Sequence, residues 1–121
     1  MTRKEYIVAI SKCNIDSDVI SKIEIAYGCL LPASIKRMLS YSEESVFFDD
    51  DYRTLSAAEI LDAEKDLHVD FGSLRMIPVI DCGENDFIVY HTAEGNWSKF
   101  NIIEECVFKK KATLDELLCL W

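Results

Sequence analysis

Residues 76–102 of this 121-residue chain read MIPVI, DCGEND, FIVY, HTAEGN and WSKFNI, and this stretch decides the fold. Three runs rich in apolar and aromatic residues, 76–80, 87–90 and 97–102, alternate with two turns that contain glycine. Such runs, separated by short turns, are typical of consecutive antiparallel strands. Pro78 lacks a backbone N–H, so it should lie on a sheet edge or where one ladder hydrogen bond is missing. We therefore expect an antiparallel meander of three strands.

Two amphipathic helices are expected within residues 14–41, on the N-terminal side of the meander. Asp16 or Ser17 can cap the first of them. Gly28 suits the left-handed backbone of a helix C-terminus, and Pro32 suits the first position of the next helix. The residues expected to face the core are Val19, Ile23, Ala26 and Tyr27 in the first helix, and Ile35, Met38 and Leu39 in the second.

Two shorter elements complete the N-terminal half. Residues 4–13 predict a helix, because Tyr6, Ile10 and Cys13 recur at helical spacing. Residues 46–48 predict a short strand. Asp49-Asp50-Asp51 should end that strand or lie on its exposed edge, since adjacent buried carboxylates would be very costly.

Capping boxes mark two further helices. Ser56 with Glu59 begins a helix over residues 57–66, and Thr113 with Glu116 begins a final helix. The apolar residues expected to face inward are Ile60 and Leu61 in the first, and Leu114, Leu117, Leu118 and Trp121 in the second.

The order of these elements defines the fold class. Helices come first, antiparallel strands lie in the middle and a helix comes last, which is the pattern of an α+β protein. We expect one domain over residues 1–121, with a single twisted, mainly antiparallel sheet whose helices cover one face.

The charge distribution limits the possible partners. The formal net charge is −9, and residues 41–70 alone contain ten acidic and two basic residues. Nucleic acids and anionic membranes attract lysine and arginine, so neither is expected as a partner. A basic protein is compatible with this charge. The alternative is that the negative charge only keeps the protein soluble.

The termini and cysteines predict a cytoplasmic protein. The apolar run at residues 6–10 is too short for a signal peptide, and no run approaches the 18 apolar residues of a membrane span. The five cysteines are an odd, scattered set without a CxxC pair, which predicts neither a disulfide framework nor a zinc site.

Few residues suggest catalysis. The chain has two histidines, His68 and His91, and lacks the HExxH, GxSxG, P-loop and GxGxxG motifs. A cysteine–histidine pair could meet only in space. We expect both histidines to be surface or edge residues, and the protein not to be an enzyme.

Two acidic groups could carry other chemistry. Asp49-Asp50-Asp51 lacks the alternating spacing that folds oxygens around Ca²⁺, so a solvated loop or a contact for a basic partner is expected instead. Asp81, Glu84 and Asp86 flank one turn and could act as paired glycosidase carboxylates, without a clear sugar platform. We expect no metal and no cofactor.

Three stretches, in this order, resemble the SUKH superfamily, which includes fungal Smi/Knr cell-wall regulators and many bacterial toxin immunity proteins. The first is residues 23–39, IEIAYGCLLPASIKRML. The second is residues 76–88, MIPVIDCGENDFI. The third lies within residues 108–118 and is carried by Thr113, Leu114, Glu116, Leu117 and Leu118.

This resemblance implies a function. Bacterial members are similar to immunity proteins that bind a cognate toxin, often a nuclease, and block it without catalysis. A nuclease needs a basic face for phosphate, and an acidic inhibitor can occupy that face. The binding residues expected here are Glu43, Glu44, Asp49, Asp50, Asp51, Tyr52, Glu84 and Asp86, with Tyr52 as an aromatic anchor.

Two alternatives remain open at this point. A regulatory scaffold or small-ligand-sensing domain, similar to the fungal relatives, would have a concave apolar pocket between sheet and helices. A hydrolase would need a buried contact between His68 or His91 and a cysteine.

Overall fold

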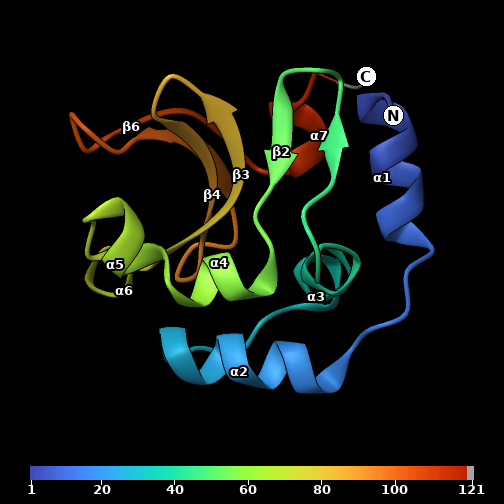
Figure 1. Cartoon of the computed structure of the whole chain (residues 1–121), viewed down its shortest axis with the longest axis horizontal. Helices are drawn as coiled ribbons and strands as arrows, with labels where there is room; N and C mark the ends of the chain where they lie inside the picture. Colours follow the sequence, from blue (N-terminus) through green and yellow to red (C-terminus); the bar gives the residue numbers. More distant parts are fainter. Residues whose placement is uncertain (120–121) are drawn as a thin grey trace.

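The computed structural model describes residues 1–119, in which short helices surround one six-stranded sheet (Figure 1). The N-terminal elements are α1 (Arg3–Ser11), α2 (Ser17–Tyr27), α3 (Ala33–Tyr41), β1 (Phe47–Phe48) and β2 (Tyr52–Thr54). Three short helices follow: α4 (Ala57–Leu61), α5 (Ala63–Leu67) and α6 (Phe71–Leu74). The remaining elements are β3 (Met76–Gly83), β4 (Asp86–His91), β5 (Trp97–Asn101), β6 (Cys106–Lys111) and α7 (Leu114–Leu117).

The α+β class is confirmed, and the sheet is larger than predicted. Its strands follow in the order β1 to β6, each antiparallel to the next. The predicted meander is β3, β4 and β5, and the strand predicted at residues 46–48 is β1. The sequence did not predict β2, which is three residues long, or β6, which ends in three lysines. Lysine has a low strand propensity, so β6 depends on pairing with β5 rather than on its own residues.

Pro78 lies in β3, an inner strand, at a place where the ladder is interrupted. The register between β3 and β4 shifts between Pro78 and Ile80, and β2 pairs with β3 only at Ile80 and Asp81. The missing N–H of the proline therefore falls at an irregular position, which is the second of the two placements that the sequence predicted.

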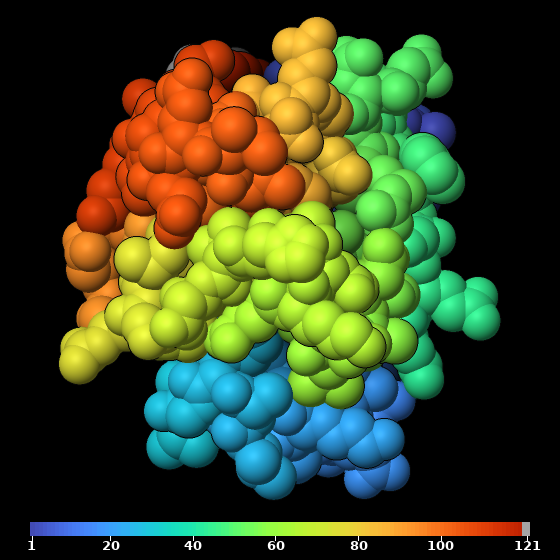
Figure 2. Space-filling model, turned by 60° about the vertical axis from the view of Figure 1, so that its left-hand side comes forward, coloured from blue at the N-terminus to red at the C-terminus, as the bar shows by residue number. Residues whose placement is uncertain are grey.

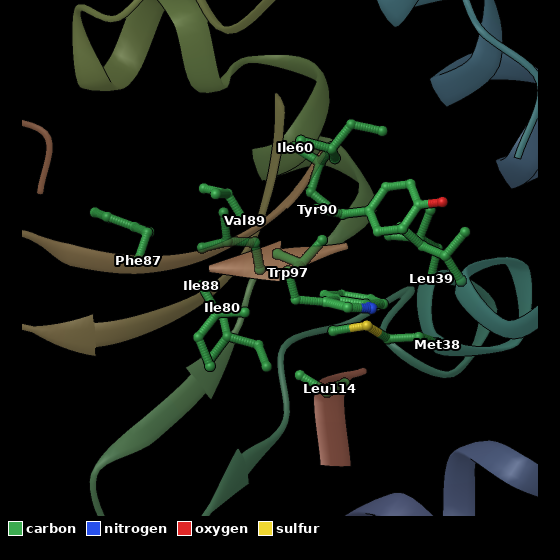
Figure 3. Packing of buried hydrophobic residues seen from close by; sticks show 14 of the residues in the cluster. Met38, Leu39, Ile60, Ile80, Phe87, Ile88, Val89, Tyr90, Trp97 and Leu114 are labelled. Carbon is green, nitrogen blue, oxygen red and sulfur yellow. The ribbon is translucent and has the colours of Figure 1, made fainter. Parts of the chain in front are cut away.

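Helices pack on both faces of the sheet, whereas the sequence predicted helices on one face. Trp97 and Phe100 are three positions apart in β5, so they point to opposite faces. Phe71 of α6 packs edge-on against Phe100, with ring centroids 6.1 Å apart. On the other face, Trp97 lies beside Met38 of α3 and Leu114 of α7 (Figure 3).

Helix ends are confirmed where a local signal defines them. Asp16 Oδ1 accepts hydrogen bonds from two N–H groups of the first turn of α2, at 3.1 and 3.3 Å. Gly28 ends α2 with φ of 64°, in the left-handed region that a residue with a Cβ adopts at a cost. Ser56 and Glu59 form both bonds of the capping box of α4. Pro32 lies one position earlier than predicted, as the N-cap of α3.

Some inward-facing residues were predicted incorrectly. In α2 the buried residues are Ile20 and Ile23, and Ala26 is exposed, so the buried face is rotated from the predicted one. The helix predicted at residues 57–66 breaks at Asp62 into α4 and α5, which leaves Leu61 exposed.

The first and last helices agree with the sequence in their buried faces. Tyr6 and Ile10 of α1 are buried, as are Leu114, Leu117 and Leu118 at the C-terminal end. Trp121, predicted to extend the last stripe, lies outside the described residues. Within the described range, no helix has the length and hydrophobicity needed to cross a membrane.

Candidate protein-interaction surface

The meander brings three of its turns to one end of the sheet. The β1–β2 turn (residues 49–51), the β3–β4 turn (84–85) and the β5–β6 turn (102–105) follow alternate strands, which run in the same direction. The backbone N–H of Ile102 donates to the carbonyl of Asn85 at 3.0 Å and ties two of the turns together. The β1–β2 and β3–β4 turns point to the top of Figure 1. In Figure 2 the orange, amber and green segments that carry the three turns lie along the upper part of the face.

We call the carboxylates of these turns and their flanks the acidic end: Asp49, Asp50, Asp51, Glu84, Asp86, Glu104 and Glu105. Five of them are exposed, namely Asp50, Asp51, Glu84, Glu104 and Glu105. Five of the residues predicted to bind a partner therefore lie at one end of the sheet: Asp49, Asp50, Asp51, Glu84 and Asp86.

The turns hold their backbone in a defined conformation. Glu84 and Asn85 both have positive φ, at 54° and 67°, which is the geometry of a two-residue type I′ hairpin turn. Asp50 and Glu105 also have positive φ, at 56° and 51°. Aspartate and asparagine tolerate this region, whereas each glutamate here costs about 1–2 kcal/mol. The exposed carboxylates are thus mounted on tight turns at the ends of paired strands.

Two members of the acidic end are occupied by internal contacts. Asp49 forms an ion pair with Arg3 of α1. Asp86 accepts a hydrogen bond from the Nδ2 of Asn101 at 2.9 Å. The same Asn101 orders the β5–β6 turn, because its Oδ1 accepts from the N–H of Glu104 at 2.9 Å. Asp49 and Asp86 therefore support the turns more than they offer charge to a partner.

Tyr52 is not the exposed aromatic anchor that the sequence predicted. Its side chain is only 7% exposed and stacks on Phe48, with ring centroids 5.1 Å apart. The guanidinium of Arg3 lies 5.1 Å from the Tyr52 ring centroid. Phe47, one residue before the buried Phe48, is 67% exposed instead. Strand alternation requires that only one of these two phenylalanines faces the core, but the sequence does not say which.

Glu43 and Glu44 do not belong to the acidic end. They precede β1, and the Glu43 carbonyl accepts a hydrogen bond from the N–H of Ala57 at the start of α4. This place is at the opposite end of β1 from the Asp49–Asp51 turn. The prediction that all eight residues share one face is therefore wrong for these two, because a strand separates them from the turn.

The sequence missed Glu104 and Glu105, and also Ile103, which is 71% exposed in the same turn. They form a hairpin turn only because β6 follows, and β6 was not predicted. The available signal was Asn101, since an asparagine side chain that bonds to the backbone two or three residues later is typical of a turn.

His91 is buried in the inner strand β4, so the prediction that both histidines are surface or edge residues is wrong for it and holds for His68. The Nε2 of His91 lies 2.7 Å from the hydroxyl of Ser98, and both side chains are buried. Burial and the nearby Lys110 lower the pKa of His91. Burial raises the pKa of the Cys82 thiol to about 12, which disfavours the nucleophilic thiolate. His68 is exposed at the end of α5.

The contacts and the clustering of the acidic residues bear on the glycosidase and metal chemistry considered for them. Asp81 lies 3.6 Å from the Nη2 of Arg53 and accepts the N–H of Gly83 at 2.8 Å, so it is tied to the β2–β3 pair. Among residues 1–119, no three histidine, cysteine or acidic side chains gather in a way that could hold a metal ion.

A second feature lies at the other end of the sheet. A pocket of about 350 Å³ opens between α1, α3, the β4–β5 turn and the start of α7. Its lining includes Ile10, Met38, Tyr90, Trp97 and Leu114, and Figure 3 shows Trp97 beside Met38 above Leu114. A pocket between sheet and helices was expected of the alternative function as a ligand-sensing domain.

No protein-family model, no curated protein and no solved structure matches this chain. Its function is therefore inferred from its own residues.

Proposed function

We propose that this protein is a SUKH-type immunity protein, which binds a cognate toxin in the cytoplasm and blocks it without catalysis. The toxin is a basic protein domain with nuclease activity, and the acidic end is the surface that meets it. The observation that carries this proposal is the gathering of five exposed carboxylates on three turns at one end of the sheet.

The order of elements supports the family assignment. The first resembling stretch, residues 23–39, spans the end of α2, Gly28 and α3. The second, residues 76–88, spans the β3–β4 hairpin. The third ends in α7, whose N-cap Thr113 accepts the N–H of Glu116.

The electrostatic argument gives the acidic end its role. A nuclease binds phosphate with lysine and arginine, and exposed carboxylates on fixed turns can occupy the same groups. Charge complementarity of this kind raises association rates from about 10⁵–10⁶ to as much as 10⁸–10⁹ M⁻¹s⁻¹ at low salt. An inhibitor that must act before its toxin damages nucleic acid benefits from such rates.

Apolar contacts are needed as well, because exposed ion pairs alone contribute little to affinity. Phe47 and Ile103 are exposed apolar residues beside or in the turns, at 67% and 71% exposure. We expect Phe47 to serve as the aromatic anchor, since aromatic residues at the centre of an interface carry much of the binding energy.

The proposal is tested by capture from a lysate of the source organism with three baits. The first is the wild-type protein. The second, the acidic-end variant, carries Asp50→Asn, Asp51→Asn and Glu84→Gln. The third, the control variant, carries Asp18→Asn, Glu43→Gln and Glu44→Gln, which removes the same charge from exposed positions away from the acidic end. Asp49 is left intact because it pairs with Arg3.

Wild-type protein and the control variant should retain one basic protein with a nuclease domain. The acidic-end variant should retain much less of it, and salt should release it from all three baits. Equal retention by the two variants would contradict the proposed surface. Retention of no basic protein by wild-type bait would contradict the proposed function.

A ligand-sensing regulatory domain is kept as a second candidate function, because the pocket beside Trp97 has the form that this function requires.

A further inference from the structure

We propose that the pocket beside Trp97 is a binding site for a small, flat aromatic molecule that is neutral or positively charged and carries a hydrogen-bond acceptor. This ligand class deepens the second candidate function and rests on it. The pocket borders the β4–β5 turn, at the opposite end of the sheet from the acidic end, so the inhibition proposed above does not depend on it.

The size and walls of the pocket suit a molecule of one or two rings. Its volume of about 350 Å³ lies at the lower end of the range of small-molecule sites, about 300–1,000 Å³. Tyr90 and Trp97 form an edge-to-face pair with centroids 4.9 Å apart, which presents aromatic surface to a ligand. Met38 completes the wall with a flexible, polarisable side chain that adapts to ligand shape.

Two polar groups of the lining have no hydrogen-bond partner within residues 1–119 and remain open to solvent. The side chains of Tyr90 and Trp97 are 4% and 6% exposed. Among the described residues, neither the Tyr90 hydroxyl nor the Trp97 Nε1 hydrogen-bonds to protein, and neither is sealed from solvent. Buried tyrosine and tryptophan usually find a partner for these atoms. A ligand in the pocket would supply that partner.

The chemistry of these groups defines what the ligand must offer. The indole N–H of Trp97 only donates, so the ligand must accept. Burial raises the pKa of Tyr90, so its hydroxyl keeps its proton at neutral pH and can donate as well. A ligand with an acceptor in or on its ring would satisfy one of these donors while its flat faces meet the apolar walls.

The charge of the lining disfavours anions. The one charged residue among the described lining is Asp115, at the start of α7. Its carboxylate would repel an anionic ligand and attract a cationic one, and the aromatic faces of Tyr90 and Trp97 also favour a cation. The site therefore differs from a phosphate or carboxylate site, which would need lysine or arginine.

The test is an NMR titration of the whole protein with two fused bicyclic aromatic probes of similar size. Quinoline accepts a hydrogen bond through its ring nitrogen, whereas indole only donates. The reporter is the indole ¹⁵N–¹H signal of Trp97, assigned from through-bond and NOE spectra of the wild-type protein. Quinoline should shift this signal saturably, with a Kd of about 1 mM or tighter, as expected of a ligand with so few atoms. Indole should bind at least about fivefold more weakly than quinoline, because it lacks the acceptor.

Variants separate the hydrogen bond from the ring. Trp97→Phe keeps an aromatic wall but removes the donor, and should weaken quinoline binding about fivefold. Because this variant lacks the indole reporter, its binding is measured by the backbone amide shifts of Leu114 and Gly95. Tyr41→Phe is the matched control, since its hydroxyl lies outside the pocket, and should bind quinoline like the wild type. The spread of amide signals verifies that both variants fold.

Three results would overturn the site: no saturable shift of Trp97 at about 5 mM quinoline, indole binding as tightly as quinoline, or Trp97→Phe binding quinoline unchanged. Because the probe comparison uses wild-type protein, it holds even if Trp97→Phe does not fold. None of these results bears on capture of a basic partner by the acidic end, so failure of one proposal is distinguishable from failure of the other.

Discussion

At the scale of single residues, Arg3 of α1 is a connecting residue, because its side chain contacts three separate parts of the molecule. It forms an ion pair with Asp49, donates to the carbonyl of Leu118 at 2.9 Å, and lies over the ring of Tyr52. One guanidinium thereby links the first helix, the β1–β2 hairpin and the C-terminal end. It also fixes the base of the turn that carries two exposed carboxylates of the acidic end, Asp50 and Asp51.

Arg3→Met should lower the free energy of unfolding by about 2 kcal/mol, because it leaves Asp49 and the Leu118 carbonyl without a donor. Arg3→Lys should retain less than half of this stabilisation, since one ammonium group cannot replace the planar guanidinium and its several donors. Urea unfolding at neutral pH measures both. Lys4→Met, a neighbouring exposed lysine, serves as the control, and an equal loss in that variant would refute the role of Arg3.

Glu59 is the residue whose charge stabilises the fold most clearly. Burial alone would raise the pKa of Glu59, but hydrogen bonds from Arg53, the Ser56 N–H and Ser45 outweigh it and lower the pKa from 4.5 to about 2. The Nη1 of Arg53 lies 2.8 Å from Glu59 Oε1. As pH falls, Glu59 of the unfolded chain therefore binds a proton at a higher pH than Glu59 of the folded protein does. The stability that this charge contributes is lost as pH falls from about 4.5 to about 2.

Glu59→Gln should cost about 1 kcal/mol at pH 7, after allowance for the partial exposure of this pair. The difference between wild type and Glu59→Gln should shrink steadily as pH falls from 4.5 to about 2, because the wild-type carboxylate is then protonated as well. Urea unfolding over that pH range measures this. A difference that stays constant with pH, or one matched by the exposed Glu44→Gln, would argue against it.

At the scale of elements, β6 shows how this fold protects an open sheet edge. Its outer side has no neighbouring strand among the described elements. Lys109, Lys110 and Lys111 lie on it, and Lys109 has a φ of 53° beside a shift in the β5–β6 register. Charge and irregular backbone on an edge strand both discourage pairing with another chain.

Lys110→Val with Lys111→Val should therefore promote self-association, seen as a molecular mass that rises with protein concentration in sedimentation. Lys4→Val with Lys22→Val makes the same change of charge on exposed positions of α1 and α2 and should have little effect. If both pairs associate equally, lost charge alone explains the result and the edge is not specifically protected.

Elements with local signals could be predicted from the sequence, and elements without them could not. Asp16, Gly28 and Ser56 each fix a helix end through bonds or backbone geometry within a few residues, so α2 and α4 start or stop as expected. By contrast, β2 has only three residues and β6 ends in three lysines, so both strands depend on pairing with their neighbours rather than on their own sequence. The burial of Tyr52 and the exposure of Phe47 depend on that pairing as well.

At the scale of the whole molecule, the acidic end could be predicted only in part. The fold divides the acidic segment at residues 41–70. Asp62, Glu64 and Asp66 lie in the α4–α5 region, whereas Asp50 and Asp51 lie in the β1–β2 hairpin turn. The meander then adds Glu84, Glu104 and Glu105 from the C-terminal half. Net charge along the chain therefore predicts a basic partner but does not define the surface that would bind it.

The overall arrangement separates the two proposed binding sites. The acidic end lies at the turns that follow β1, β3 and β5, and the pocket beside Trp97 borders the turn that follows β4. A rigid antiparallel sheet spans the distance between them. A macromolecular partner and a small ligand could therefore bind at the same time.

The central claim is that the acidic end steers a basic partner into contact. Its most direct test is stopped-flow association of the captured partner with wild type, the acidic-end variant and the control variant, from about 20 mM to about 500 mM salt. The rate constants of wild type and the control variant should fall steeply with salt. The acidic-end variant should be about tenfold slower at low salt, depend less on salt, and converge with the others at high salt. Equal salt dependence in the two variants, or none in wild type, would contradict the claim.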